Sequence, residues 1–231
     1  MNIICRHLPV PAALWMSYLL LAGAAAAEPP AATISGTSPD GLGTWSVHYQ
    51  RFDDDGTPAA EAINGHIDAE ANRQVTQATW DGSTRRPWTF DAAGTMNVRA
   101  VTVAEVFTGS YNTDEPHMPM DTLGSVVCDR RSGNIITWDD LFADKTAGLS
   151  RLGELTAAQL AAVASPTELR SWRRQGQFAP VDINFRYWMP TDAGIELHFP
   201  SVRFGPGRTV MTIPWAEVRD QIDSEYLAIT R

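Results

Sequence analysis

Cysteine is almost absent from this sequence, which contains only Cys5 and Cys128 among 231 residues. Cys5 lies ahead of an apolar run, residues 12–21, and that run is followed by small residues ending at Ala27. This order is typical of a secretory signal peptide that is cleaved after Ala27. Cleavage leaves Cys128 as the single thiol, so no internal disulfide is expected. We predict that Cys128 is a small buried strand residue.

Long apolar runs are also missing beyond the N-terminus. The run at residues 12–21 is shorter than the roughly 20 residues that a membrane-spanning helix needs, and no second candidate follows it. We therefore predict a signal peptide at residues 1–27 and a mature protein without a stable membrane span. Its expected location is secreted, periplasmic or in the cell envelope. An uncleaved N-terminal anchor is the alternative.

Basic residues are in the minority, with 18 Lys and Arg against 27 Asp and Glu. Residues 1–27 contain one basic residue, Arg6, and no acidic residue, so the mature chain has 17 basic and 27 acidic residues and a net charge of −10. Binding to nucleic acid needs clustered Lys and Arg, so we expect no nucleic-acid partner. The acidic field favours a basic protein partner, although such a surface also serves solubility alone.

Motifs of common hydrolases and metalloenzymes are missing. The sequence has no Gly-x-Ser-x-Gly elbow, which would place a nucleophilic serine on a strained turn between a strand and a helix. The histidines of the mature chain have no ligand-like spacing, and no pair stands at positions i and i+4 of one helix. We therefore expect no metal site and no cofactor.

Periodic patterns predict an α+β fold. Residues 28–43 are rich in Pro, Ala, Ser and Gly without periodicity, which predicts a flexible lead-in before a single domain at residues 44–231. Residues 44–50 alternate as a half-buried strand, and residues 59–79 repeat apolar side chains at helical spacing. The prediction is a curved, mostly antiparallel sheet packed by this N-terminal amphipathic helix, with further helices in the middle and at the C-terminus.

Two segments in the middle of the chain predict specific turns. Residues 95–107 are strand-like after a turn at Gly94, but their alternation changes phase, which predicts a bulge or a strand that crosses between two packing environments. Residues 126–142 predict a hairpin that turns at Gly133 and then leads into a short helix.

The rest of the chain continues the mixture of strands and helices. Two helical pieces broken at Pro166 are expected over residues 149–175. The segments with the alternation of strands are residues 181–187, 195–199 and 209–213. A last helix is expected to begin at Pro214.

The polar stretch at residues 108–121 is predicted to be a long irregular loop, and we expect the functional site there. Its candidate ligand contacts are Tyr111, His117, Met118 and Asp121. The same stretch offers an alternative catalytic set, in which His117 activates Ser110 as a nucleophile and Asp114 or Asp121 orients the histidine. Trp88 and Trp188 are candidates for exposed contacts with a ligand.

The order of several motifs resembles the RsiV-like domain family. The motifs are residues 133–142, a following helical segment, the strand at residues 195–199, the glycine corner at 205–207, and residues 213–218 leading into a closing helix. The chain also looks like the secreted mycobacterial immunogenic antigen family. In the RsiV-like family a histidine precedes the hairpin in a Gly-Gly-x-His-Pro loop. His117 stands at the corresponding place here, without the glycines.

This resemblance implies an α+β domain outside the membrane. In anti-sigma factors of this type the domain is a sensor that binds lysozyme, and some mycobacterial relatives are described as cell-wall esterases. We therefore expect a secreted, non-catalytic domain that binds a protein or glycan at the bacterial cell envelope, with a basic, lysozyme-like protein among the candidate partners. The alternative is a cell-envelope serine esterase acting on short-chain or lipid esters.

Overall fold

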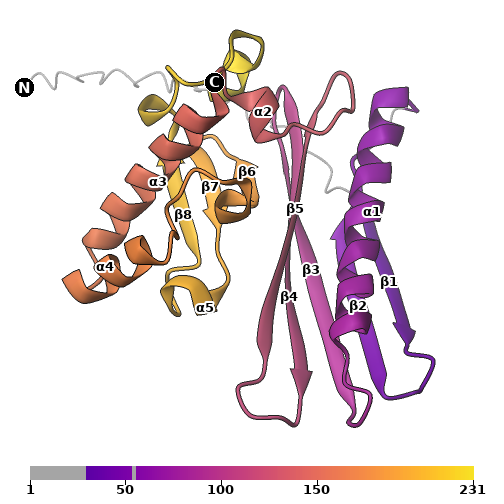
Figure 1. The fold of residues 1–231 in the computed structure, drawn as a ribbon. Helices are drawn as coiled ribbons and strands as arrows, with labels where there is room; N and C mark the ends of the chain where they lie inside the picture. The colour runs from indigo at the N-terminus through magenta and orange to yellow at the C-terminus, as the bar shows by residue number, and fades with distance from the viewer. Residues whose placement is uncertain (1–29, 54–55) are drawn as a thin grey trace, which may run out of the picture.

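The computed structural model describes residues 30–53 and 56–231. The predicted signal peptide at residues 1–27 lies outside the described residues. The first half of the described chain forms one large sheet with a helix on it, and the second half forms a lobe of smaller elements on the other face of that sheet (Figure 1).

The large sheet has five strands in the order in which they occur along the chain. They are β1 (Ala31–Thr37), β2 (Gly43–Gln50), β3 (Trp88–Val98), β4 (Thr102–Thr113) and β5 (Met120–Asp129). Neighbouring strands are antiparallel except β2 and β3, which are parallel. A parallel pair needs a long crossover connection, and helix α1 (Pro58–Asp81) supplies it.

Helix α1 confirms the amphipathic helix predicted from the sequence. The Thr57 hydroxyl accepts a hydrogen bond from the Ala60 amide at 3.2 Å and caps its first turn. Its apolar face packs on the sheet in a core that also contains side chains of β2 to β5. The helix members of this core are Ile63, Ile67, Ala71 and Ala78.

The second lobe, residues 138–231, covers the opposite face of the sheet. Its antiparallel strands are β6 (Tyr187–Pro190), β7 (Gly194–His198) and β8 (Val210–Pro214). Its helices are α2 (Trp138–Leu141), α3 (Lys145–Ala161), α4 (Pro166–Arg174) and α5 (Ser201–Phe204), joined by the 3-10 turns η1 (Asp182–Phe185), η2 (Trp215–Glu217) and η3 (Ser224–Thr230). A second core joins this lobe to Ala104, Val106 and Val127 of the large sheet. The large sheet is therefore the middle layer between α1 and the second lobe.

The predicted flexible lead-in at residues 28–43 is wrong over much of its length, because it contains strand β1. Strand β1 pairs with β2 from Ala31 opposite Gln50 to Thr37 opposite Thr44. Strand β1 is at the edge of the sheet, and its side chains are exposed or half-buried. Its sequence therefore does not have to alternate between apolar and polar residues. The physical signal that sequence reasoning used is therefore missing there.

The phase change at residues 95–107 marks a turn rather than a bulge. Strand β3 ends at Val98, the chain turns, and β4 begins at Thr102, so the two phases belong to two antiparallel strands. The predicted turn at Gly94 is also wrong, because Gly94 lies inside β3. A Cβ at Gly94 would stand only 2.0 Å from a carboxylate oxygen of Glu105, so any larger residue would have to displace this buried side chain.

Several predictions for the second half of the chain need correction. The predicted strand at residues 181–187 is mostly the 3-10 turn η1, and the last helix is replaced by η2 and η3. The second arm of the predicted hairpin is reduced to one bridge, between Cys128 and Ile135. The helical pair broken at Pro166 is confirmed as α3 and α4.

Cys128 is fully buried in β5, as predicted. Burial, helped by the neighbouring charge of Asp129, raises the pKa of its thiol to about 12. A thiol in this state is a structural residue and a poor nucleophile.

Candidate functional site

The free edge of β5 is the place where all three layers of the protein meet. A cleft of about 370 Å³ opens there, which we call the Arg186 cleft. Helix α1 contributes His66, Ala69, Glu70 and Arg73; β5 contributes Ser125, Val126 and Val127; the second lobe and the segment leading to it contribute Ile135, Ile136, Thr137, Trp138, Asp182, Arg186 and Trp188. Side chains from segments far apart in the sequence therefore converge on one hollow.

Strand β5 is the last strand of the sheet, so every second residue turns its backbone N–H and C=O away from β4. Near its end these outward groups are used: the Val127 carbonyl accepts from the Ile136 amide, and the Asp129 amide donates to the Asn134 carbonyl, both at 2.8 Å. Alternation places Ser125 in the same outward phase. Within the described parts of the chain, its backbone N–H and C=O make no hydrogen bond beyond the sheet.

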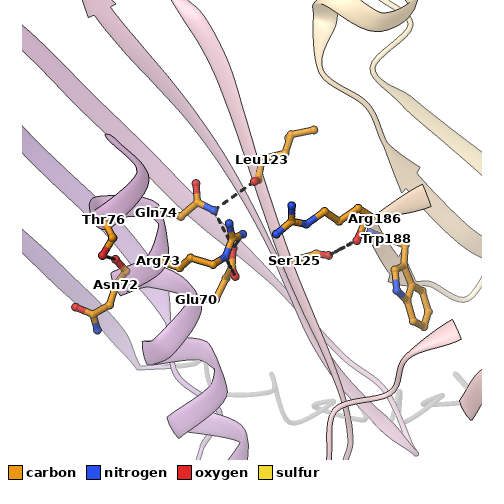
Figure 2. A network of polar contacts seen from close by, with 9 residues as sticks. All are labelled: Glu70, Asn72, Arg73, Gln74, Thr76, Leu123, Ser125, Arg186 and Trp188. Carbon is orange, nitrogen blue, oxygen red and sulfur yellow. Dashed lines mark hydrogen bonds and ion pairs between the residues drawn. The ribbon is translucent and has the colours of Figure 1, made fainter. Parts of the chain in front are cut away.

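Three polar residues of α1 approach this edge as one network (Figure 2). Arg73 forms a two-pronged ion pair with Glu70, with Nε at 2.7 Å from one carboxylate oxygen. The Gln74 amide donates to Glu70 at 2.8 Å and, more weakly, to the Leu123 carbonyl of β5 at 3.3 Å. Gly124 permits this contact, because a Cβ there would lie 2.0 Å from Glu70 and 2.3 Å from Gln74.

The opposite wall is tied to β5 through Ser125 (Figure 2). Its hydroxyl donates to the Arg186 carbonyl at 3.4 Å and accepts from the Trp188 amide at 3.3 Å. The Trp188 ring stacks on Trp138 with 4.4 Å between ring centroids. Both rings are buried, at 4% and 5% exposure, so the predicted exposure of Trp188 is wrong. Trp88 was likewise expected at the surface and is 3% exposed.

The Arg186 cleft carries one cationic group that has no acidic partner among the described residues. Glu70 is paired with Arg73, and Asp182 is paired with Lys145 at 3.0 Å. The Arg186 guanidinium lies over the ring of the adjacent Tyr187 and extends across the cleft toward the Glu70 and Arg73 pair (Figure 2). The unpaired guanidinium makes the cleft locally positive, although the formal net charge of the chain is −9. The cleft therefore favours an anionic group.

A smaller hollow of about 190 Å³, the Asp121 pocket, lies nearer the start of β5. The end of α1, the start of β5 and the region of α5 line it. Two predicted site residues are in its wall, Tyr111 and Asp121. Tyr111 is 4% exposed and its hydroxyl accepts from the Ser83 amide at 2.9 Å, whereas Asp121 is exposed. Of these two predicted site residues, Asp121 is therefore the one whose side chain is accessible to a ligand.

The predicted long loop at residues 108–121 is mostly strand. Strand β4 continues to Thr113 and β5 begins at Met120, which leaves residues 114–119 as the connection. Most side chains at this end of the two strands are exposed or half-buried, so polar residues are tolerated there. The sequence therefore resembles a loop although the backbone forms regular strands. Ser110 stands directly opposite Asp121 in the strand pairing.

The alternative catalytic residues are not assembled. His117 lies on the exposed connection with a positive φ of 69°, followed by Met118 and a cis bond to Pro119. Asp114 pairs with Arg86 at 3.0 Å. No hydrogen bond joins Ser110, His117 and Asp121 in the described residues, so the nucleophile, base and acid roles have no geometric support.

Apart from Trp188, the residues that form the Arg186 cleft and its polar network were not among the predicted contacts. Glu70, Arg73 and Gln74 stand at positions i, i+3 and i+4 of α1, which is the spacing of a polar helix face that ordinarily meets solvent. Arg186 lies in a segment predicted to be a strand. Gly124 lies between the predicted loop at residues 108–121 and the predicted hairpin at residues 126–142, so its close approach to α1 was not predicted either. Over residues 30–53 and 56–231, no group of three or more potential ligand side chains could hold a metal ion.

This arrangement defines the fold class of the protein. It is an α+β fold in which a curved sheet lies between a long helix and a lobe with a second sheet, consistent with the fold of DUF3298 proteins. The structure is similar to that of a DUF3298 family member from Bacteroides fragilis NCTC 9343, with a TM-score of 0.60, 12% sequence identity, and coverage of 88% of this chain and 97% of that one. It is also similar to a DUF3298 family protein from Pseudomonas aeruginosa PAO1, with a TM-score of 0.52, 13% identity, and coverage of 86% and 96%.

At these identities the likeness shows the fold alone. No protein-family model matches the sequence, and a search of curated proteins finds no match. The DUF3298 family is related to RsiV-like domains, so the fold agrees with the resemblance seen in the sequence, whereas membership of the RsiV-like family itself stays a prediction. None of the helices in the described part of the chain is both long and apolar enough to cross a membrane.

Proposed function

We propose that this protein is a non-catalytic module that binds a protein or glycan ligand at the cell envelope, and that the ligand occupies the Arg186 cleft. The observation that carries the proposal is the convergence of α1, the β5 edge and the second lobe on a hollow with one unpartnered guanidinium. The predicted signal peptide supplies the location. The overall acidic charge favours the approach of a basic protein, and the local charge of the cleft favours an acidic group on whichever ligand binds.

Filling the cleft is expected to abolish binding without disturbing the fold. Ala69 lies on the exposed rim of the cleft on α1, so an Ala69→Trp side chain would occupy the hollow. Asn72 is exposed on the same helix and points away from the cleft, so Asn72→Trp is the matched control (Figure 2). Titrations with lysozyme and with soluble peptidoglycan fragments should show an affinity loss of at least about tenfold for Ala69→Trp only. Equal affinities of the two variants for every probe that binds would contradict the proposed site.

The esterase alternative leads to a separate expected result. Hydrolysis of a short-chain nitrophenyl ester by the protein should not exceed that of a Ser110→Ala variant, because no hydrogen bond within residues 30–53 and 56–231 joins the Ser110 hydroxyl to a base. The measurement is the initial rate for both proteins, with circular dichroism as the control for folding. A rate that disappears in the Ser110→Ala and His117→Ala variants while both stay folded would replace the binding proposal with the esterase.

A further inference from the structure

We propose that the ligand of the Arg186 cleft is an extended acidic peptide, which adds to the free edge of β5 as another strand and places a carboxylate on Arg186. This inference rests on the proposed function and names the chemical class of its ligand. It follows from three features of the cleft: the unpaired strand edge, the Gln74 contact and the charge of Arg186.

The first feature is the backbone of β5 itself. Asp121, Leu123 and Ser125 share the outward phase of the edge, as do Val127 and Asp129, which already pair with residues 134–136. The chain thus begins to cover this edge and then turns away into α2. An incoming strand would continue the pairing from Ser125 toward Asp121, past both the Arg186 cleft and the Asp121 pocket.

The second feature is the side-chain amide of Gln74. It donates to the outward carbonyl of Leu123, where the N–H of a neighbouring strand would otherwise donate. Gln74 is 3% exposed and is held on its other side by Glu70. At 3.3 Å the bond to Leu123 is long, so a peptide N–H could replace it at small cost. Gln74 therefore satisfies the strand edge in the absence of a partner.

The third feature decides the charge of the peptide. Arg186 is exposed and has no acidic partner in the described residues, while the cations of Arg73 and Lys145 are already paired with carboxylates. A carboxylate that reached Arg186 would form a charge-assisted hydrogen bond without displacing another pair. Ile135, 45% exposed, offers an apolar contact beside it.

The same walls argue against a glycan as the ligand of this edge. Sugars bind to exposed aromatic faces, but the rings of Trp138 and Trp188 are buried against one another. A strand edge presents donors and acceptors at the spacing of another polypeptide backbone. The geometry therefore favours a peptide.

The experiment uses a phage library of short random peptides selected against the whole protein. The enriched peptides are synthesised in three forms, one unmodified and two N-methylated at alternate residues in the two opposite phases, and their affinities are measured by fluorescence polarisation. N-methylation removes backbone donors and keeps every side chain, so we expect about tenfold weaker binding of the methylated peptides in one of the two phases. Arg186→Gln should cost about tenfold as well, whereas the exposed Arg174→Gln control on α4 should cost nothing.

Three outcomes would overturn the inference. Peptides that bind equally well in every methylated form, or whose affinity is unchanged by Arg186→Gln, would rule out strand addition with a carboxylate on Arg186. If Ala69→Trp still weakens those peptides, they occupy the cleft and the proposed function stands. Failure to enrich any peptide, together with binding of an N-acetylglucosamine oligomer that Ala69→Trp abolishes, would assign the cleft to a glycan. Failure to enrich any peptide and absence of binding by lysozyme, peptidoglycan fragments and the oligomer would reject both the inference and the proposed function.

Discussion

Between about pH 4 and about pH 8, the Glu105→Gln variant is expected to gain about 3 kcal/mol of unfolding free energy relative to the unsubstituted protein. The prediction concerns this change with pH in the difference between the two proteins. Glu105 lies on β4 with no solvent exposure, between the sheet and α1. Burial raises the pKa of its carboxyl from 4.5 to about 7, opposed by a hydrogen bond from the Gln50 amide and assisted by the charge of Asp68. Its second oxygen has no hydrogen-bond partner in the described residues.

The sign of the effect follows from proton linkage. The carboxyl has a higher pKa in the folded protein than in the unfolded chain, so its stabilising contribution is complete below about pH 4.5 and is lost as the pH rises through about 7. Glutamine does not titrate and lacks this loss. Urea unfolding of both proteins across this range gives the difference directly, independently of any constant cost of the substitution. Parallel pH profiles of the two proteins would show that Glu105 ionises in the fold at its ordinary pKa.

The second large expected effect is a loss of about 3 kcal/mol of unfolding free energy on replacing Arg99 by methionine. Arg99 lies in the turn between β3 and β4, and its side chain is 5% exposed. Its guanidinium donates to the Ile229 carbonyl at 2.5 Å and to the Arg231 carbonyl at 2.8 Å, so it fastens the C-terminus to the large sheet. Methionine keeps an apolar stem over Trp215 but leaves these carbonyls without their donor.

The matched control for Arg99 is Asp192→Asn. Asp192 accepts from the Arg99 Nε at 3.1 Å, but its side chain is 99% exposed, so this ion pair should be worth less than about 1 kcal/mol. Chemical denaturation of the two variants compares them on one scale. Equal, small losses for both would mean that the backbone contacts of Arg99 contribute little to joining the second lobe to the sheet.

Strong periodicity made parts of the fold predictable from the sequence. Helix α1 was predicted because its apolar residues repeat at helical spacing, and the break between α3 and α4 because Pro166 cannot continue a helix. Strand β1 and the end of β4 were missed because their exposure gives no alternation of apolar residues. The segment of η1 was predicted as a strand because its apolar residues alternate, but Val181 and Ile183 are exposed and only Phe185 of the turn is buried, so the alternation marks no buried face.

The candidate site was less predictable than the fold, for a physical reason. Polar residues on a helix ordinarily face solvent, so Glu70 and Arg73 gave no sign of a cleft until the place of β5 at the sheet edge was known. Arg186 acquires its role only from a wall built by the second lobe. In contrast, the loop selected from its polar composition proved to be two paired strands with a short connection. The predicted contacts His117 and Met118 lie on that connection, away from the wall of either hollow.

Hydrogen exchange tests the placement of the ligand most directly. Amide protection would be compared between the free protein and the protein saturated with lysozyme, peptidoglycan fragments or a selected peptide, whichever binds. We expect new protection in residues 121–127 of β5, with smaller changes at residues 66–74 and 182–188. Protection confined to residues 114–119, with the amides of Leu123 and Ser125 exchanging as in the free protein, would contradict it.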